Sequence, residues 1–483
     1  MVLHKFIKRT LIVVCAFTLA ACGAQKQYSI EDIDLPDPFQ LPDSIGQHLE
    51  NSLIPRNQFF KDTILKELID QALENNFEIR IANKEMDINQ ALFKQSKAAF
   101  YPQVNLNLFS IERRWFSENS RNSPNSDWYD RKNNTPSKSL FLERADHTSS
   151  IALDWEVDIW GKLRNQKKQA SALYRQSHVA RRALQTELIA TVAEDYYQLL
   201  SLDEQLEVAK KNHKFRDSTL TMIKLLYDSG EVSALAVQQS QSQVLEASSL
   251  ISKLNEQRDI QENNLRLLVG KFPGPITRTT TLKVEDSSYQ EVKELPLYLV
   301  QNRPDVLISQ YGLIAANARV GVTQAQRFPN LTITAEAGVE SLLPQNWFNI
   351  PGSLFGSVIG GLTAPVFNGR ALKTEYEIAL FERDEAEIDF QRNVYEAVVD
   401  IQNALTSLKS LEDQLEIADV QQLVSQKALT NSRMLFGSGF ADYLEVITAQ
   451  TEALKTELDL VQTKAALLSM RIQLYRALGG GWQ

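Results

Sequence analysis

Residues 151–159 read Ile-Ala-Leu-Asp-Trp-Glu-Val-Asp-Ile, and a run without Pro or Gly follows from Lys162 to Leu226. The first segment alternates apolar and mostly acidic side chains, which predicts a strand with one apolar and one polar face. The second contains no helix breaker, and a continuous helix over it would span about 95 Å. A globular domain has no room for such a helix. The fold therefore depends on a two-faced strand that leads directly into an extended helix.

The second half of the chain repeats this design. Leu226-Tyr-Asp-Ser-Gly230 matches Leu435-Phe-Gly-Ser-Gly439 at an offset of 209 residues, and Tyr101-Pro102 matches Phe328-Pro329 at an offset of 227. A second run without Pro or Gly extends from Arg370 to Phe436. Matched Gly and Pro positions favour an internal tandem repeat over a chance similarity of amphipathic helices.

Each half reads as helix, strand, strand, long helix, turn and helix. The expected strands cover about 102–111 and 148–160 in the first half, and about 329–340 and 353–367 in the second. One helix is expected over roughly 62–100, and a polar stretch fills 112–146. We therefore predict a mixed α and β membrane protein.

The last helix carries a heptad repeat of Val446, Ala453, Leu460, Leu467 and Leu474. This periodicity predicts coiled-coil packing. A structural coiled-coil scaffold without a channel is an alternative, but it leaves the strand pairs unexplained.

The four strands resemble transmembrane β-strands, which alternate between lipid-facing and water-facing side chains. A soluble hairpin with one wet face would look the same over any single strand. Four strands cannot close a barrel, and lipid tolerates no open sheet edge. Other chains must therefore complete the sheet.

The first 21 residues are predicted to be a signal peptide. Lys5, Lys8 and Arg9 form a basic start, and the apolar run 11–19 is too short to span a bilayer as a helix. The run leads to Cys22 in a Leu-Ala-Ala-Cys sequence that resembles a bacterial lipobox; an ordinary signal peptide is the alternative. We expect N-palmitoyl and S-diacylglycerol groups on Cys22. Because no aspartate follows it, resemblance to the lipoprotein sorting rule favours the outer membrane.

Composition argues against several functions. The net charge of −9 argues against a nucleic-acid partner. The other cysteine, Cys15, lies in the signal peptide, so the mature chain has no disulfide and no thiolate metal site. No stretch of 18 apolar residues follows the signal. The mature histidines (His48, His147, His178 and His213) are scattered and no catalytic motif is present, so we expect no enzyme, no metal and no cofactor beyond the lipid on Cys22.

An ordered set of motifs resembles the TolC-like outer-membrane factors. It includes Arg303-Pro304-Asp305-Val306, Arg327-Phe328-Pro329, the Leu226 to Gly230 string and the ending Ala477-Leu478-Gly479-Gly480-Gly481-Trp482. The lipobox and this ending are most similar to the NodT branch, the lipoprotein outer components of resistance-nodulation-division (RND) pumps.

The resemblance implies a homotrimer. Each chain would give four strands to a 12-stranded β-barrel in outer-membrane lipid, and long antiparallel coiled-coil helices would form a tunnel across the periplasm. The implied domains are a lipid-anchored equatorial segment (22–61), a first repeat (62–274), an equatorial linker (275–300) and a second repeat (301–483). The implied partners are a periplasmic adaptor (membrane fusion) protein and an inner-membrane RND-type pump.

The helical turns near 227–235 and 436–448 are the expected periplasmic gate. The candidate gate residues are Asp228, Glu231, Asp442, Leu444, Glu445 and Thr448. Symmetry copies would place like charges in a ring, which selects for cations. Alternatively these acids cap helices, for which Asp442 is the best candidate. The family commonly has Val-Leu-Asp-Ala-Gln where this chain has Val446-Ile447-Thr448-Ala449-Gln450, so Thr448 replaces the usual carboxylate.

The function we predict is that of an outer-membrane channel, the passive exit duct of a tripartite efflux pump. The duct of a type I protein secretion system is one alternative, and a structural periplasmic coiled-coil lipoprotein is another. The sequence leaves the substrate open, since drug and metal exporters share this outer part.

Overall fold

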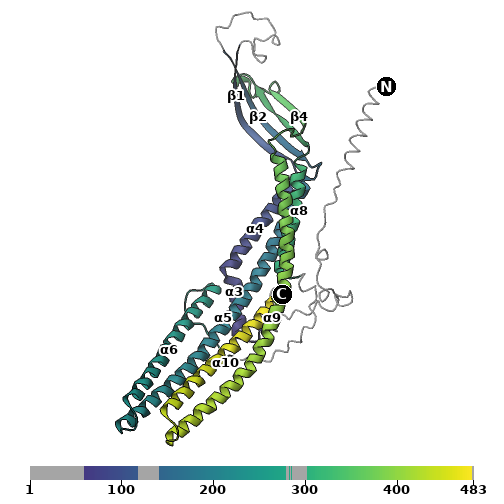
Figure 1. Cartoon of the computed structure of the whole chain (residues 1–483). Helices are drawn as coiled ribbons and strands as arrows, with labels where there is room; N and C mark the ends of the chain where they lie inside the picture. Colours follow the sequence, from purple (N-terminus) through teal and green to yellow (C-terminus); the bar gives the residue numbers. More distant parts are fainter. Residues whose placement is uncertain (1–58, 118–140, 279–281, 283, 285–301, 481–483) are drawn as a thin grey trace, which may run out of the picture. The chain divides into compact units, whose positions relative to one another are not determined.

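The computed structural model describes residues 59–117, 141–278, 282, 284 and 302–480, and Figure 1 shows its helices and strands in chain order. The chain forms two compact units. Among the described residues, the first contains 90–117, 141–172 and 314–385, and the second contains 59–89, 173–278, 302–313 and 386–480. Each unit therefore combines parts of both halves of the sequence, which is a different division from the two predicted repeats.

The first unit contains an antiparallel sheet of four strands in the order β1-β2-β3-β4. The strands are β1 (Gln103–Ser117), β2 (Phe141–Val157), β3 (Asn330–Ser341) and β4 (Leu354–Thr363). The register aligns Leu153 with Val104 and with Ala335, so these side chains share one face. Asp154 aligns with Thr334 on the opposite face. The alternation predicted from residues 151–159 is therefore confirmed.

The first two strands extend further into the polar stretch than predicted. Residues 112–117 pair with 141–146, although the prediction ended these strands near 111 and 148. Neighbouring charges pair here, with Arg114 Nη2 2.6 Å from Glu112 Oε2. Main-chain hydrogen bonds build a ladder whatever the side-chain polarity. An apolar pattern alone therefore underestimates such strands.

Two strands also end earlier than predicted, β2 at Val157 and β4 at Thr363. After β2, the Asp158 carboxylate accepts hydrogen bonds from the amides of Leu163 and Arg164, and so caps the next helix. After β4, Pro365 has no N–H to donate to a ladder.

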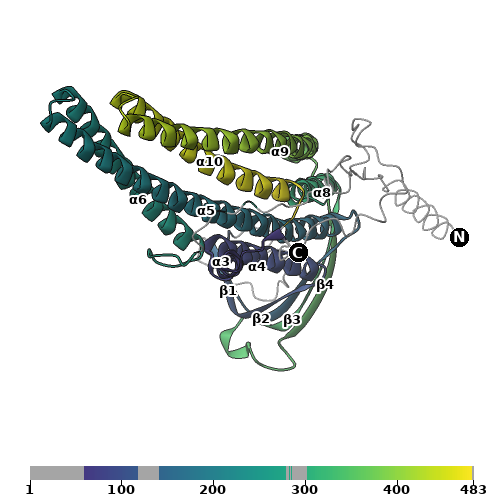
Figure 2. The same ribbon diagram turned by 90° about the horizontal axis from the view of Figure 1, so that it is seen from below.

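The long helices are present as predicted. They are α5 (Lys162–Asp228) and α9 (Ala371–Gly437), each of 67 residues, followed by α6 (Ala234–Leu268) and α10 (Tyr443–Ala477), each of 35. The remaining helices are α3 (Thr63–Asn75), α4 (Phe77–Ala98) and α8 (Pro304–Ala325). Helices α5 and α6 form one antiparallel hairpin and α9 and α10 form another (Figures 1 and 2).

The prediction of one helix over roughly 62–100 was wrong, because the helix breaks at Asn76. The side-chain Oδ1 of Asn76 accepts from the Glu78 amide at 2.9 Å, and its Nδ2 donates to the Leu268 carbonyl at 3.0 Å. The side chain thus satisfies the start of α4 and ties it to the end of α6.

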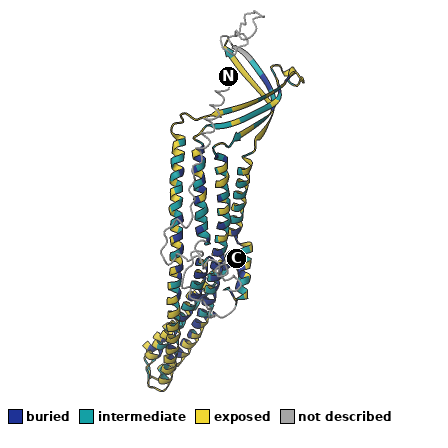
Figure 3. Cartoon of the chain, turned by 90° about the vertical axis from the view of Figure 1, so that its right-hand side faces the viewer, coloured by how far each residue is buried: buried dark blue, intermediate teal, exposed yellow. Residues whose placement is uncertain are grey.

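The second unit holds the main hydrophobic core. All five heptad positions of α10 are buried, which confirms the predicted seam: Val446, Ala453, Leu460, Leu467 and Leu474. Two of them, Leu467 and Leu474, pack in a core with Val394 and Ile401 of α9, and a separate core contains Tyr196 and Leu265, which are fully buried. Buried residues line the faces on which these helices meet (Figure 3). No helix among the described residues is long and apolar enough to cross a membrane.

Candidate functional site

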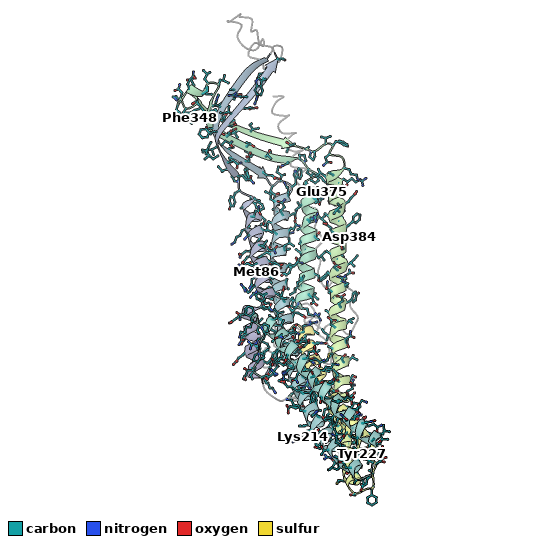
Figure 4. All side chains as sticks on the ribbon, turned by 90° about the vertical axis from the view of Figure 1, so that its left-hand side faces the viewer. Met86, Lys214, Tyr227, Phe348, Glu375 and Asp384 are labelled. Atoms are coloured by element: carbon teal, nitrogen blue, oxygen red, sulfur yellow. The ribbon has the colours of Figure 1, made fainter. Side chains whose placement is uncertain are left out.

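The tips of the two helical hairpins are built in the same way. In the first, the amides of Gly230 and Glu231 donate to the carbonyls of Tyr227 and Leu226. In the second, the residues 209 positions later repeat both hydrogen bonds. Gly230 has a φ of +79° and Gly439 a φ of +77°, which side chains disfavour. Each glycine therefore ends a helix in a Schellman turn and lets the chain reverse. Tyr227 marks the first tip in Figure 4.

The structure places four predicted gate residues together at the start of α10. Asp442 is the N-cap, and its Oδ1 accepts from the Tyr443 amide at 2.6 Å. Leu444 is 55% exposed, and its carbonyl accepts from the Thr448 hydroxyl at 2.8 Å. Asp442, Leu444, Glu445 and Thr448 are all exposed. The capping interpretation of Asp442 is therefore correct, and its exposed carboxylate remains available for a second role.

The other two predicted gate residues lie on the first tip. Asp228 is the last residue of α5, and Glu231 follows Gly230 in the turn; both are exposed. The prediction overlooked a direct link between the two hairpins near these tips. The Tyr443 hydroxyl donates to Gln239 Oε1 at 2.8 Å. A tyrosine in the first turn of a helix gives no local sign of such a partner.

Polar side chains are buried where the helices of the second unit meet, both within the first hairpin and between the two hairpins. Gln450, 2% exposed, donates to the Thr219 hydroxyl at 2.8 Å. Arg216, 3% exposed, donates to the Gln243 carbonyl at 2.8 Å and to Glu246 at 3.1 Å. Such contacts fix the register of packed helices more specifically than apolar contacts do. Such contacts leave no local pattern in the sequence, because Gln450 and Thr219, for example, lie 231 residues apart.

Arg278 and Arg303 flank the segment between the two halves, and each forms several hydrogen bonds with helices of the second unit. Arg278 binds Asp203 and Glu262, and these carboxylates raise the pKa of its guanidinium despite partial burial. Arg303 donates to Asp305, to Asp400 and to the carbonyls of Ala397 and Ala477. Burial alone would lower the pKa of Arg303, but its two carboxylate partners outweigh burial and raise it. The Arg303 motif therefore has a structural role.

Three carboxylates on the helices of the second unit are only partly exposed. Burial raises the pKa of Glu194, Asp195 and Glu457. Hydrogen bonds from neighbouring glutamine side chains act in the opposite direction. Because ionisation of these carboxylates costs folding stability, we expect the stability of the helical unit to depend on pH.

The polar face of the sheet is acidic. Thr334 donates to Asp154 at 3.0 Å, and Ser150 donates to Glu336 at 2.5 Å. Lys162 donates to Glu156 at 3.0 Å. The opposite face is apolar in the part of the sheet where Val104, Leu153, Ala335 and Val358 align across the four strands. This sheet can therefore separate an apolar medium from an aqueous one.

The described part of the chain contains no metal-binding cluster. No group of three or more His, Cys, Asp or Glu side chains there could hold a metal ion. The histidines have separate neighbours: His178 contacts Tyr174, and His213 contacts Ser248. Cys22 and residues 22–58 of the predicted equatorial segment 22–61 lie outside the described residues, as does most of the linker 275–300.

Comparison with known proteins identifies the family. Residues 68–271 and 295–480 match the family model described as outer membrane efflux protein. The cation efflux system protein CusC of Escherichia coli O6:H1 is 25% identical over 475 residues, 97% of each chain. The probable outer membrane lipoprotein SilC of Salmonella typhimurium is 25% identical over 484 residues, 98% of this chain and 99% of that one. The Campylobacter jejuni CmeC outer membrane channel superimposes with a TM-score of 0.82 at 19% identity, covering 95% of both chains. The chain belongs to the outer membrane efflux protein family.

Proposed function

We propose that the chain is the outer-membrane exit duct of a tripartite efflux pump. The observation that carries this proposal is the two-faced sheet, joined to helices of 67 residues, in a member of this family. Transmembrane strands need one lipid-facing and one water-facing side. Each long helix corresponds to about 100 Å of path. A periplasmic tether would need the helices but not an apolar sheet face.

The two halves are proposed to be a tandem duplication. The paired helices have equal lengths, and the hairpin turns repeat the same two hydrogen bonds. The ends of α6 and α10 do so as well, since Gly270 and Gly479 close matching turns. Two segments of unrelated origin would not be expected to have both equal helix lengths and the same hydrogen bonds in their turns.

Three copies are proposed to close a 12-stranded β-barrel. Strands β1 and β4 are the edges of the sheet, and each has a strand partner on one side only among the described residues. An unpaired main chain cannot be left facing lipid. Pairing of β1 in one copy with β4 in the next would satisfy both edges.

The helices also carry apolar faces suited to contact between copies. On α9, Ile388, Tyr395 and Val399 are 65%, 51% and 54% exposed. On α4, Ile81 and Ile88 are 52% and 59% exposed. Spacings of four and seven residues place such side chains on one side of a helix. Contact with neighbouring copies would bury these side chains and assemble the helices into a tunnel.

The remaining assignments follow from this duct. Cys22 would carry the lipid anchor, in keeping with a relative described as a probable outer membrane lipoprotein. The helical tips would meet a periplasmic adaptor protein bound to an inner-membrane RND-type pump. Asp228, Glu231, Asp442, Leu444, Glu445 and Thr448 would line the gate.

Conductance of the purified, full-length protein in a planar lipid bilayer tests the proposal. We expect discrete channels from a folded oligomer, with preference for cations because the polar sheet face and the tips are acidic. The double substitution Leu153→Glu and Ala335→Glu, on the apolar sheet face, should abolish insertion. The matched change Thr334→Glu, on the polar face, should not. Absence of current from a folded oligomer would contradict the proposal.

A further inference from the structure

Positive charge is concentrated at one end of the sheet, where the strands meet the helices. The register places the start of β1, the end of β2, the start of β3 and the end of β4 at the same end of the sheet, next to the helices. The adjoining segments 94–102, 158–168, 326–330 and 368–377 contain nine Lys or Arg but only three Asp or Glu. The chain as a whole has a net charge of −9. The segments at this end of the sheet therefore carry a net positive charge, whereas the chain as a whole is negative.

Six exposed cations define what we call the basic belt: Lys94, Lys97, Arg164, Lys167, Arg327 and Arg370. Aromatic rings lie beneath three of them. Lys97 Nζ is 4.1 Å from the Phe93 ring centroid, Lys167 Nζ is 5.9 Å from that of Phe100, and Arg327 Cζ is 5.0 Å from that of Tyr376. Each ring contacts one side of the charged group, and the side chain as a whole remains exposed to solvent.

Aromatic side chains with polar handles lie between the basic belt and the apolar sheet face. Trp155, on the apolar face, donates its indole N–H to the Phe100 carbonyl at 3.1 Å. Trp160 donates to the Pro329 carbonyl at 2.7 Å and stacks on Phe328 at 4.9 Å. The order from sheet to helices is thus apolar, then aromatic, then basic. That sequence of polarity matches the boundary between hydrocarbon and headgroups.

We propose that the basic belt binds the phosphates of anionic phospholipids in the periplasmic leaflet of the outer membrane. This inference rests on the proposed function, since it requires the apolar sheet face to contact lipid. Arg164 and Arg370 also pair with Asp158 and Glu377 at 3.0 and 3.1 Å. Their side chains are nonetheless 67% and 64% exposed, so each guanidinium can bridge a carboxylate and a phosphate. Glu375, near the start of α9, is labelled in Figure 4. It is one of the three acidic residues that reduce the positive charge of these segments.

Electron spin resonance on the full-length protein in phosphatidylcholine vesicles tests this inference. The probes are spin-labelled phosphatidylglycerol and spin-labelled phosphatidylcholine, and the measurement is the fraction of each that the protein immobilises. The test variant is Lys94→Gln, Lys97→Gln and Lys167→Gln. The control variant is Lys214→Gln, Lys224→Gln and Lys253→Gln, which removes exposed lysines from α5 and α6 in the second unit.

The wild type and the control should prefer phosphatidylglycerol severalfold, and the test variant should lose most of that preference. Added salt should weaken the wild-type preference as well. Equal immobilisation of both lipids by the wild type, or an unchanged preference in the test variant, would overturn the inference. If one of these results is obtained while the same vesicles conduct ions, only the inference that the basic belt binds anionic lipid is contradicted. If neither lipid is immobilised and no current flows, the proposed function fails with it.

Discussion

Arg303 Nη2 lies 3.1 Å from Asp400 Oδ2, and the same guanidinium donates to the Ala477 carbonyl at the end of α10. One side chain thus joins the start of α8 to α9 and α10. Because Arg303 is 7% exposed, its charge is almost fully removed from water. Four acceptors compensate for that loss of hydration.

Arg303→Met should destabilise the helical unit by about 2–4 kcal/mol, because it removes the donor to the Ala477 carbonyl at the end of α10 and the cation that pairs with Asp305 and Asp400. Methionine has a similar length, so lost packing contributes little. The measurement is the thermal unfolding midpoint by circular dichroism. Lys409→Met, at an exposed position of α9, is the control and should change stability by no more than about 0.5 kcal/mol. Equal midpoints for the two variants would contradict a structural role for Arg303.

The sequence predicted the long helices and the sheet alternation because local patterns encode both. The runs without Pro or Gly became α5 and α9, and residues 151–157 became the end of β2. Arg303 and Asp400 are different, since 97 residues separate them and no periodicity links them. Glycines likewise predicted the hairpin tips, and the position of Asp442 after Gly439 predicted its cap of α10. The Tyr443 bond to Gln239 spans 204 residues and was equally invisible.

Gly338→Ala should destabilise the sheet by on the order of 2–3 kcal/mol. A Cβ at this position would lie 2.1 Å from the Ser149 carbonyl oxygen, which belongs to the backbone of β2 and cannot turn aside. Gly360→Ala in β4 is the matched control, because no atom lies within 4 Å of its added Cβ. Resistance of the purified protein to thermal unfolding compares the two. A Gly338 variant as stable as the Gly360 variant would show that the β2–β3 pairing is looser than described.

Asp442 can be tested for its two roles separately. Asparagine caps helices about as well as aspartate but carries no charge, whereas alanine does neither. Asp442→Asn should therefore reduce cation selectivity at unchanged stability. Asp442→Ala should reduce selectivity and also cost about 0.5–2 kcal/mol. Reversal potentials in a salt gradient and unfolding midpoints provide the two measurements. An unchanged reversal potential in both variants would remove Asp442 from the gate lining.

Thr448→Asp should increase cation selectivity. Thr448 is exposed one helical turn after Leu444, to which its hydroxyl is bonded, so both occupy the same side of α10. A carboxylate there would add one negative charge per copy to the proposed gate. Thr406→Asp is the matched control, because Thr406 is also exposed and bonded to the carbonyl four residues before it, but it lies on α9 far from the hairpin tip. Equal reversal potentials for the two variants would indicate a general charge effect rather than a lining position.

Asp195→Asn should stabilise the helical unit at neutral pH. Partial burial raises the pKa of Asp195 when the protein is folded, although the hydrogen bond with Gln261 opposes the shift. Ionisation therefore costs folding stability. That cost is absent below the unfolded pKa of about 4 and develops as the pH rises through the folded pKa. The variant cannot ionise here, so its unfolding midpoint should exceed that of the wild type at neutral pH and converge with it in acid. Asp217→Asn, at an exposed position of the same helix, should give no such divergence. A constant difference between Asp195→Asn and the wild type at every pH would instead indicate a change in packing.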